Sequence, residues 1–155
     1  MPKGFEKHRL VAFLFLFVLL SDQLSKLFVV KSLHVGESIN VFSFFNVVRV
    51  QNRGVTFGLL SGTLQPVVLV VLSLVVVWFL ADYARKNENY RLPVSLIIGG
   101  AVGNIIDRVI HQSVIDFLDF HLGIYHWPAF NIADSAIVIG VFVLLFMSYS
   151  EGKSG

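Results

Sequence analysis

The 155-residue sequence contains no cysteine and few charged residues. Without a thiol, the chain cannot form disulfides, attack a substrate with a thiolate, or ligate zinc or an iron–sulfur cluster through cysteine. Charged residues make up only 14% of the chain and the net charge is +2. No block of like charges is present, so no nucleic-acid partner is expected. Hydrophobic residues make up 55% of the chain, which is too high for a soluble protein of this length and indicates a membrane protein.

Four apolar stretches are long enough to cross a bilayer, which takes about 20 helical residues. They cover residues 10–30, 64–81, 92–110 and 132–149 approximately. The first has a basic start, as a signal peptide does, but no small-residue cleavage motif follows it, so we expect a retained helix. We predict an all-α membrane protein, with one domain over residues 1–155, four transmembrane helices and a disordered tail from Glu151 onward.

The distribution of lysine and arginine predicts how the chain is oriented. These residues occur at both termini and between the second and third apolar stretches, and residues 112–131 contain none. Since short cytoplasmic loops carry the excess of lysine and arginine, both termini are expected in the cytoplasm. Segments 31–63 and 111–131 are then expected on the outer side of a bacterial inner membrane. Lys31, Arg49 and Arg53 run against this rule, but their segment is longer, so its charges count for less.

The first outer segment is predicted to contain a small β-element. Residues 38–51 are rich in valine, phenylalanine and isoleucine and contain neither proline nor glycine, which is typical of one or two short strands. Asn52-Arg53-Gly54 is a turn signal. Because an isolated small sheet is marginal in water, we expect it to rest on the membrane surface, where it could cover a substrate as a clamp.

Two groups of polar residues interrupt the apolar stretches. Asp22 and Lys26 are four residues apart and share a helix face, so they can form an ion pair. Asn104, Asp107 and Arg108 form a polar stripe on the third stretch, in which Arg108 can bind a carboxylate with two parallel hydrogen bonds. Each group can be explained by internal pairing or as the scaffold of a polar site. For Asp107 the partner would be Arg108 or a residue of a neighbouring helix.

Two aspartates near the outer face are the best candidates for chemistry, because an ionisable group at a bilayer is costly and usually has a task. Asp134 also fits a helix-capping position, three residues after an N-capping Asn131, which explains it without catalysis. Asp116 has no such explanation. Two carboxylates held close share one proton, so that one can activate water while the other protonates a peptide carbonyl. Asp107 and Asp119 remain alternative partners for Asp116.

Other functions are less well supported by the sequence. His111, His121 and His126 have spacings of ten and five residues, which do not match a one-turn ligand pair, so we expect no metal and no cofactor. Transport by a proton relay would be favoured by internal repeats, and none is found. A lipid phosphotransferase generally uses a metal-binding carboxylate cluster at the cytoplasmic face, where only Asp82 lies. A structural assembly factor would tolerate the loss of both aspartates.

Five short motifs, which follow one another over residues 22–135, carry a resemblance to a known family. They are Asp22-Gln23-Leu24-Ser25-Lys26, Asn52-Arg53-Gly54-Val55-Thr56-Phe57, Gly99-Gly100-Ala101-Val102-Gly103-Asn104-Ile105-Ile106-Asp107-Arg108, Val114-Ile115-Asp116-Phe117 and Phe130-Asn131-Ile132-Ala133-Asp134-Ser135. Together they resemble the lipoprotein signal peptidases, or signal peptidase II, which are bacterial inner-membrane aspartyl proteases. One departure is Thr56, where the family usually has alanine.

The resemblance implies an enzyme that removes the signal peptide from diacylglyceryl-modified prolipoproteins, cutting just before the lipidated cysteine. Its partners are then the lipid-modified substrates and membrane lipid, and a monomer is expected because one chain holds the whole site. The family's catalytic aspartates correspond to Asp116 and Asp134. From its place at a helix start, Asp134 is expected as the anion, and Asp116, which we expect in an apolar loop, as the neutral acid. The family's site-shaping positions correspond to Asp22, Lys26, Asn52, Gly54, Asn104, Asp107, Arg108 and Asn131.

Overall fold

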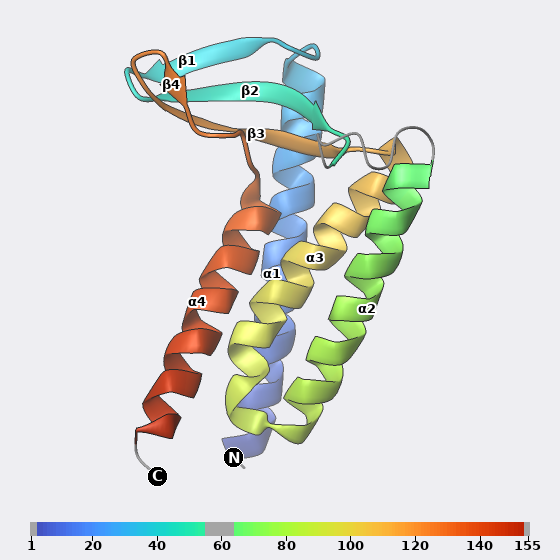
Figure 1. The fold of residues 1–155 in the computed structure, drawn as a ribbon, viewed down its shortest axis with the longest axis vertical. Helices are drawn as coiled ribbons and strands as arrows, with labels where there is room; N and C mark the ends of the chain where they lie inside the picture. Colours follow the sequence, from blue (N-terminus) through green and yellow to red (C-terminus); the bar gives the residue numbers. More distant parts are fainter. Residues whose placement is uncertain (1–2, 55–63, 154–155) are drawn as a thin grey trace.

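The computed structural model describes residues 3–54 and 64–153. Within these residues, four long helices form a bundle, and a four-stranded sheet lies across one end of it (Figure 1). The helices are α1 (Lys3–Ser32), α2 (Leu64–Lys86), α3 (Arg91–His111) and α4 (Ile132–Gly152), and a 3-10 turn, η1 (Glu88–Tyr90), precedes α3. All four helices are long and apolar enough to cross a membrane, which confirms the predicted class of fold.

The helices extend beyond the predicted apolar stretches. Helix α1 begins at Lys3, α2 continues to Lys86, and α4 continues to Gly152, because hydropathy marks only the part of a helix that suits the hydrocarbon core. The predicted disorder from Glu151 onward is wrong for Glu151 itself. It lies in α4 and accepts a hydrogen bond of 2.6 Å from the hydroxyl of Tyr90.

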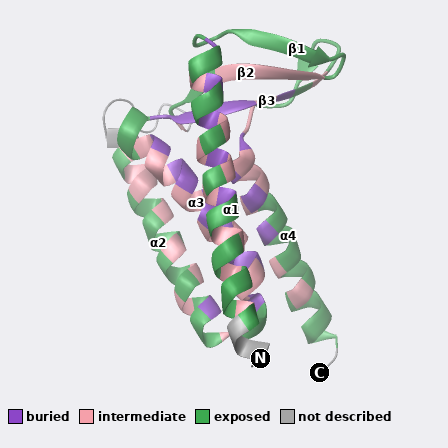
Figure 2. Cartoon of the chain, turned by 180° about the vertical axis from the view of Figure 1, so that it is seen from behind, coloured by how far each residue is buried: buried purple, intermediate pink, exposed green. Residues whose placement is uncertain are grey.

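Helix α3 is the centre of the bundle. It packs against α1, α2 and α4 and contains many of the buried residues (Figure 2). Small residues allow these close approaches. A Cβ atom at Gly100 would collide with the carbonyl oxygen of Ala133 in α4, and one at Gly103 would lie 2.6 Å from Oδ2 of Asp22 in α1. The glycines therefore bring polar groups of both neighbouring helices against the backbone of α3.

The sheet draws on both predicted outer segments. Strands β1 (Ser38–Phe42) and β2 (Phe45–Asn52) form the β-element expected over residues 38–51, and β3 (Val114–Leu122) and β4 (Tyr125–His126) follow α3. All pairings are antiparallel, in the order β1-β2-β3-β4. In this register Asp116 lies opposite Val50. The placing of Asp116 in a loop was therefore wrong, although the run of β-branched and aromatic residues around it is typical of a strand.

The sheet lies at the opposite end of the bundle from both ends of the chain and from the turn between α2 and α3 (Figure 1). The sheet end also contains Asp116, in β3, and Asp134, in the first turn of α4. The two candidate catalytic residues therefore lie at one end of the bundle. That this end faces the outside of the cell remains a prediction from the loop charges.

Candidate active site

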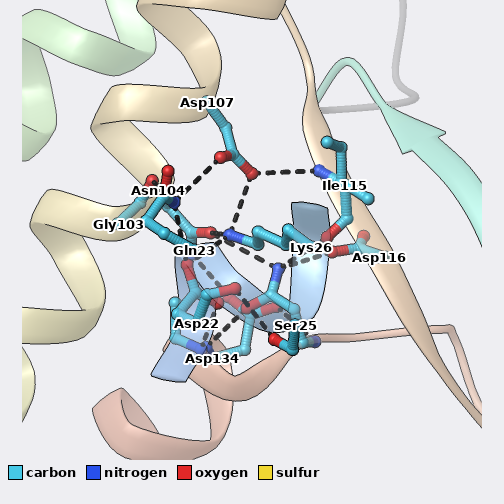
Figure 3. Close-up of polar contacts among 12 residues, drawn as sticks. Asp22, Gln23, Ser25, Lys26, Gly103, Asn104, Asp107, Ile115, Asp116 and Asp134 are labelled. Carbon is cyan, nitrogen blue, oxygen red and sulfur yellow. Dashed lines mark hydrogen bonds and ion pairs between the residues drawn. The ribbon is translucent and has the colours of Figure 1, made fainter. Parts of the chain in front are cut away.

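A buried lysine lies at the centre of the polar residues (Figure 3). The ammonium nitrogen of Lys26 is 2.7 Å from Oδ2 of Asp22 and 2.8 Å from Oδ2 of Asp107, and it donates to Oδ1 of Asn104 at 3.1 Å. These contacts use all three donors of an ammonium group. The predicted pair of Asp22 and Lys26 is confirmed. Of the two pairings expected for Asp107, the one with a neighbouring helix is confirmed, because Lys26 of α1 binds that carboxylate, and the one with Arg108 is wrong.

The two aspartates beside Lys26 also hold the neighbouring elements in place. Oδ1 of Asp22, in α1, accepts a hydrogen bond of 2.9 Å from the backbone of Ala133, in α4. Oδ2 of Asp107, in α3, accepts one of 3.2 Å from the backbone of Ile115, in β3. Gln23 donates to both carboxylates. The buried cluster therefore fixes α1, α3, α4 and the strand that carries Asp116 relative to one another.

Asn104 connects this cluster to Asp134. Because Lys26 can only donate, it binds the oxygen of the Asn104 amide, and the amide nitrogen of Asn104 then donates to Oδ1 of Asp134 at 2.8 Å. The second oxygen of Asp134 accepts a bond of 3.3 Å from the backbone of Asn131. The predicted capping position is confirmed, since the side chain of Asn131 accepts a bond of 2.9 Å from the backbone of Asp134.

Asp116 is held by two side-chain amides. Asn52, at the end of β2, donates to its Oδ2 at 2.9 Å, and Asn131 donates to its Oδ1 at 2.7 Å. The pKa of Asp116 is raised to about 6, mainly by burial. The charge of Asp134 contributes to this rise, while the bonds from Asn52 and Asn131 oppose it. Asp116 is therefore close to its titration point near neutral pH, and Asp134 is close enough to affect it.

Two further residues that were expected to shape the site, Arg108 and Gly54, are connected to the residues around this pair. Arg108 donates to the backbone oxygen of Asn104 at 3.2 Å and interacts electrostatically with Asp134, while its Nε is buried without a hydrogen-bond partner among the described residues. Gly54 has a φ of +105°, which favours glycine. Its backbone donates to Oδ1 of Asn52 at 2.9 Å, so this turn orients the amide that binds Asp116. Thr56 lies outside the described residues.

Asp119 is not a partner of Asp116. The two residues are three apart in β3, so their side chains point to opposite faces of the sheet. Asp119 instead contacts Nδ1 of His126 at 2.9 Å and accepts a bond of 2.9 Å from Asn46. The structure thus brings Asp116 together with Asp134 through Asn131. No local sequence pattern predicts the contact between Asp119 and His126, because this contact depends on pairing within the sheet.

An open cavity of about 410 Å³ adjoins Asp134. Trp127 and Phe130 line it on the side of the sheet, and Val138 and Ile139 line it one turn further along α4. The latter two side chains are exposed, as is typical of a surface that faces lipid. The cavity can therefore place an apolar group beside a half-buried carboxylate.

Comparison with known proteins gives consistent matches. The family model described as signal peptidase (SPase) II matches residues 14–150. The lipoprotein signal peptidase of Syntrophotalea carbinolica is 44% identical over 137 residues, which cover 84% of this chain and 85% of that protein. That of Cupriavidus taiwanensis is 48% identical over 135 residues, which cover 84% and 77%. A solved bacterial membrane enzyme, determined by the in meso method, is 30% identical, with a TM-score of 0.81 over 93% of this chain and 90% of that chain.

The fold and these matches define a multi-pass protease of the bacterial inner membrane. Within that class, the chain belongs to the signal peptidase II family. The resemblance carried by the five short motifs is thereby confirmed.

Proposed function

We propose that this protein is an aspartyl endopeptidase that removes the signal peptide from diacylglyceryl-modified prolipoproteins, cutting just before the lipidated cysteine. Its membership of the signal peptidase II family supports the substrate class. The observation that carries the mechanism is the position of Asn131. Its side-chain amide donates to the carboxylate of Asp116, and its backbone N–H donates to the carboxylate of Asp134. Two carboxylates held close together by one residue can share a proton.

The proposed reaction needs only these two residues and water. Ionised Asp134 takes a proton from water, and the resulting hydroxide attacks the carbonyl carbon of the scissile bond. Asp116, protonated, gives its proton to the carbonyl oxygen. In the next step the proton now on Asp134 passes to the leaving amine as the C–N bond breaks, while Asp116 recovers a proton from the hydroxyl group. The free carboxylic acid and the free amino group of the cysteine are then released.

The environment of each aspartate supports this division of roles. Asp134 lies at N3 of α4, where the helix dipole favours an anion, and Asn104 donates to it. Asp116 is only 2% exposed and has a raised pKa, which favours its neutral form. Because the carboxylates interact, the pair titrates as a unit, and the assignment describes the preferred arrangement of one shared proton.

The cavity beside Asp134 would hold the lipid part of the substrate. Its exposed apolar side chains on α4 offer a surface for acyl chains, and lipid bound there would keep the adjacent peptide bond near both aspartates. Holding a bond in reach of its catalytic groups is a large source of rate enhancement. The site would then face the outer leaflet, with both termini in the cytoplasm, and a single chain would suffice.

A cleavage assay tests this proposal. Purified protein in detergent is given a diacylglyceryl-modified prolipoprotein and, as a matched control, the same precursor without the lipid. The products are identified by mass. We expect cleavage of the modified precursor only, between the residue before the cysteine and the cysteine itself, with no loss of rate in EDTA. Cleavage at another bond, inhibition by EDTA, or ion flux in vesicles without cleavage would contradict the proposal.

A further inference from the structure

A second open cavity, of about 350 Å³, lies at the tip of the sheet. We call it the hairpin cavity. Its walls include Phe44, Phe120, His121, Tyr125, His126 and Trp127. Trp127 also lines the cavity beside Asp134, so one indole forms a wall of both. The size and the aromatic lining of the hairpin cavity are those of a binding site for a small ligand or a short peptide segment.

The hairpin cavity contains an oriented imidazole. Nδ1 of His126 is 2.9 Å from the Asp119 carboxylate, which can only accept hydrogen bonds when it is ionised. Burial alone would raise the pKa of Asp119, but the hydrogen bonds from His126 and Asn46 hold that pKa below its usual value. Neutral His126 therefore donates through Nδ1, and its Nε2 is an acceptor.

A line of hydrogen bonds across the sheet supports this orientation. Asn40 in β1 donates to Oδ1 of Asn46 in β2 at 3.0 Å, and Asn46 donates to Oδ2 of Asp119 in β3 at 2.9 Å. With the contact between Asp119 and His126, the line reaches β4. All four strands thus help to position His126, whereas a surface histidine without a ligand needs no such support.

Polar atoms at this cavity lack partners within the part of the chain that the structure describes. Both ring nitrogens of His121 are buried without a hydrogen bond, and its ring stacks on that of His126 with 4.7 Å between centroids. A buried polar group without a partner is costly. The N–H and C=O groups of a peptide backbone would supply both the donor and the acceptor that the ring of His121 lacks.

We propose that the hairpin cavity binds the first residues of the mature chain, on the carboxyl side of the cut, and that Nε2 of His126 accepts a hydrogen bond from their backbone. The inference rests on the proposed function, which places the scissile bond at Asp134. From there the signal peptide and lipid remain at the membrane, and the hairpin cavity is next to the site on the side of the sheet, because Trp127 lines both cavities. A segment of roughly four extended residues spans about 13 Å.

The test compares two substrates that share the signal peptide and the lipidated cysteine. One ends at that cysteine, as an amide, and the other continues for roughly four residues, or about 13 Å when extended. The measured quantity is the ratio of their kcat/KM values in detergent. For the wild-type protein we expect kcat/KM to be about ten-fold higher for the longer substrate, mainly because its KM is lower. A ten-fold ratio corresponds to about one hydrogen bond plus apolar contact.

The variant His126→Asn tests the imidazole without removing its support. Asparagine retains a donor near the position of Nδ1, so the bond to Asp119 and the sheet can be kept, but it lacks Nε2. We expect the ratio to fall toward one. His126→Gln places an amide near the position of Nε2 and should therefore restore part of the preference for the longer substrate. The control is His111→Ala, because His111 is exposed at the end of α3 and does not line the cavity; it should keep the wild-type ratio.

Other results would overturn the inference. A wild-type ratio near one, or a ratio that His126→Asn leaves unchanged, would show that the mature chain is not bound here. A preference that depends on added phospholipid and not on peptide length would indicate a lipid headgroup in the hairpin cavity. If the wild-type protein cleaves neither substrate, the peptidase proposal itself fails, and this inference fails with it.

Discussion

The side-chain amide of Asn131 donates to Oδ1 of Asp116 at 2.7 Å. The same side chain accepts the backbone N–H of Asp134 and so caps α4. One residue therefore has two separable tasks: it starts the helix that carries one aspartate, and it holds the carboxylate of the other. These tasks can be separated by substitution.

We predict that Asn131→Ala reduces both stability and activity. The loss of the cap should cost about 1 kcal/mol, and the displacement of Asp116 should lower kcat/KM about 100-fold or more. Asn131→Ser is the matched control, because serine is a good N-cap but lacks the amide that binds Asp116. Thermal unfolding in detergent should therefore rank serine above alanine, while both variants are nearly inactive. Full activity of Asn131→Ser would show that the amide bond to Asp116 is dispensable.

The pH profile should report the protonation of Asp116. Because the proposed reaction needs Asp116 protonated and its pKa is raised to about 6, kcat/KM should fall about ten-fold per pH unit above that value. The bond from Asn52 lowers this pKa. Asn52→Ala should therefore move the falling limb to higher pH.

The control for the pH profile is Asn46→Ala. Asn46 lies in the same strand, β2, but donates to Asp119 and does not contact the aspartate pair. Its substitution should leave the position of the limb unchanged. A limb that moves to lower pH in Asn52→Ala would contradict the proposed protonation state.

Lys26 should be essential to the fold of the site. Lys26→Met leaves the carboxylates of Asp22 and Asp107 buried without their cation, and breaking a buried ion pair in this way costs about 3–5 kcal/mol. Adding Asp107→Asn removes one unpaired charge and should restore part of the lost stability. Lys31→Met, at the exposed end of the same helix, should have a much smaller effect. Thermal unfolding of the four proteins checks this, and equal stability of Lys26→Met and Lys31→Met would contradict it.

The close approach of α1 to α3 predicts a steric effect. At Gly103 a Cβ would lie 2.6 Å from Oδ2 of Asp22, so Gly103→Ala should displace that carboxylate from Lys26 and destabilise the protein by about 1–3 kcal/mol. Gly152 has no atom within 4 Å of the same position, and Gly152→Ala should be neutral or slightly stabilising. A neutral Gly103→Ala would mean that the helices can separate at no cost.

The sequence was most informative where the interaction is local. The four apolar helices, the capping of α4 by Asn131 and the pair of Asp22 with Lys26 each depend on residues within a turn or a single span, and each was predicted. Strand β3 was not predicted, although its β-branched and aromatic residues are typical of a strand, because the periodicity of a short apolar run does not by itself identify a buried strand. It becomes a strand by pairing with β2, more than 60 residues earlier in the chain.

The hydrogen-bond and ion-pair partners within the site could likewise be identified only from the structure. Asn104, Asp107 and Arg108 were recognised as a stripe on one helix face, but which group each binds depends on how α1 packs against α3. Lys26 takes Asp107, which leaves Arg108 without a carboxylate bound by hydrogen bonds in the described part of the chain. The contact of Asp119 with His126 had no local signal at all, since it arises from the position of β4 beside β3.

The most direct test of the account is cleavage of a diacylglyceryl-modified prolipoprotein by the wild-type protein and by Asp116→Asn, Asp134→Asn and Asp119→Asn, each shown to be folded by thermal unfolding. If Asp116 and Asp134 form the catalytic pair, each of the first two substitutions should reduce kcat at least about 1,000-fold, and Asp119→Asn should retain cleavage within about ten-fold. Robust cleavage by Asp116→Asn or Asp134→Asn would contradict the account, and the loss of activity in Asp119→Asn alone would place the chemistry on the other face of β3.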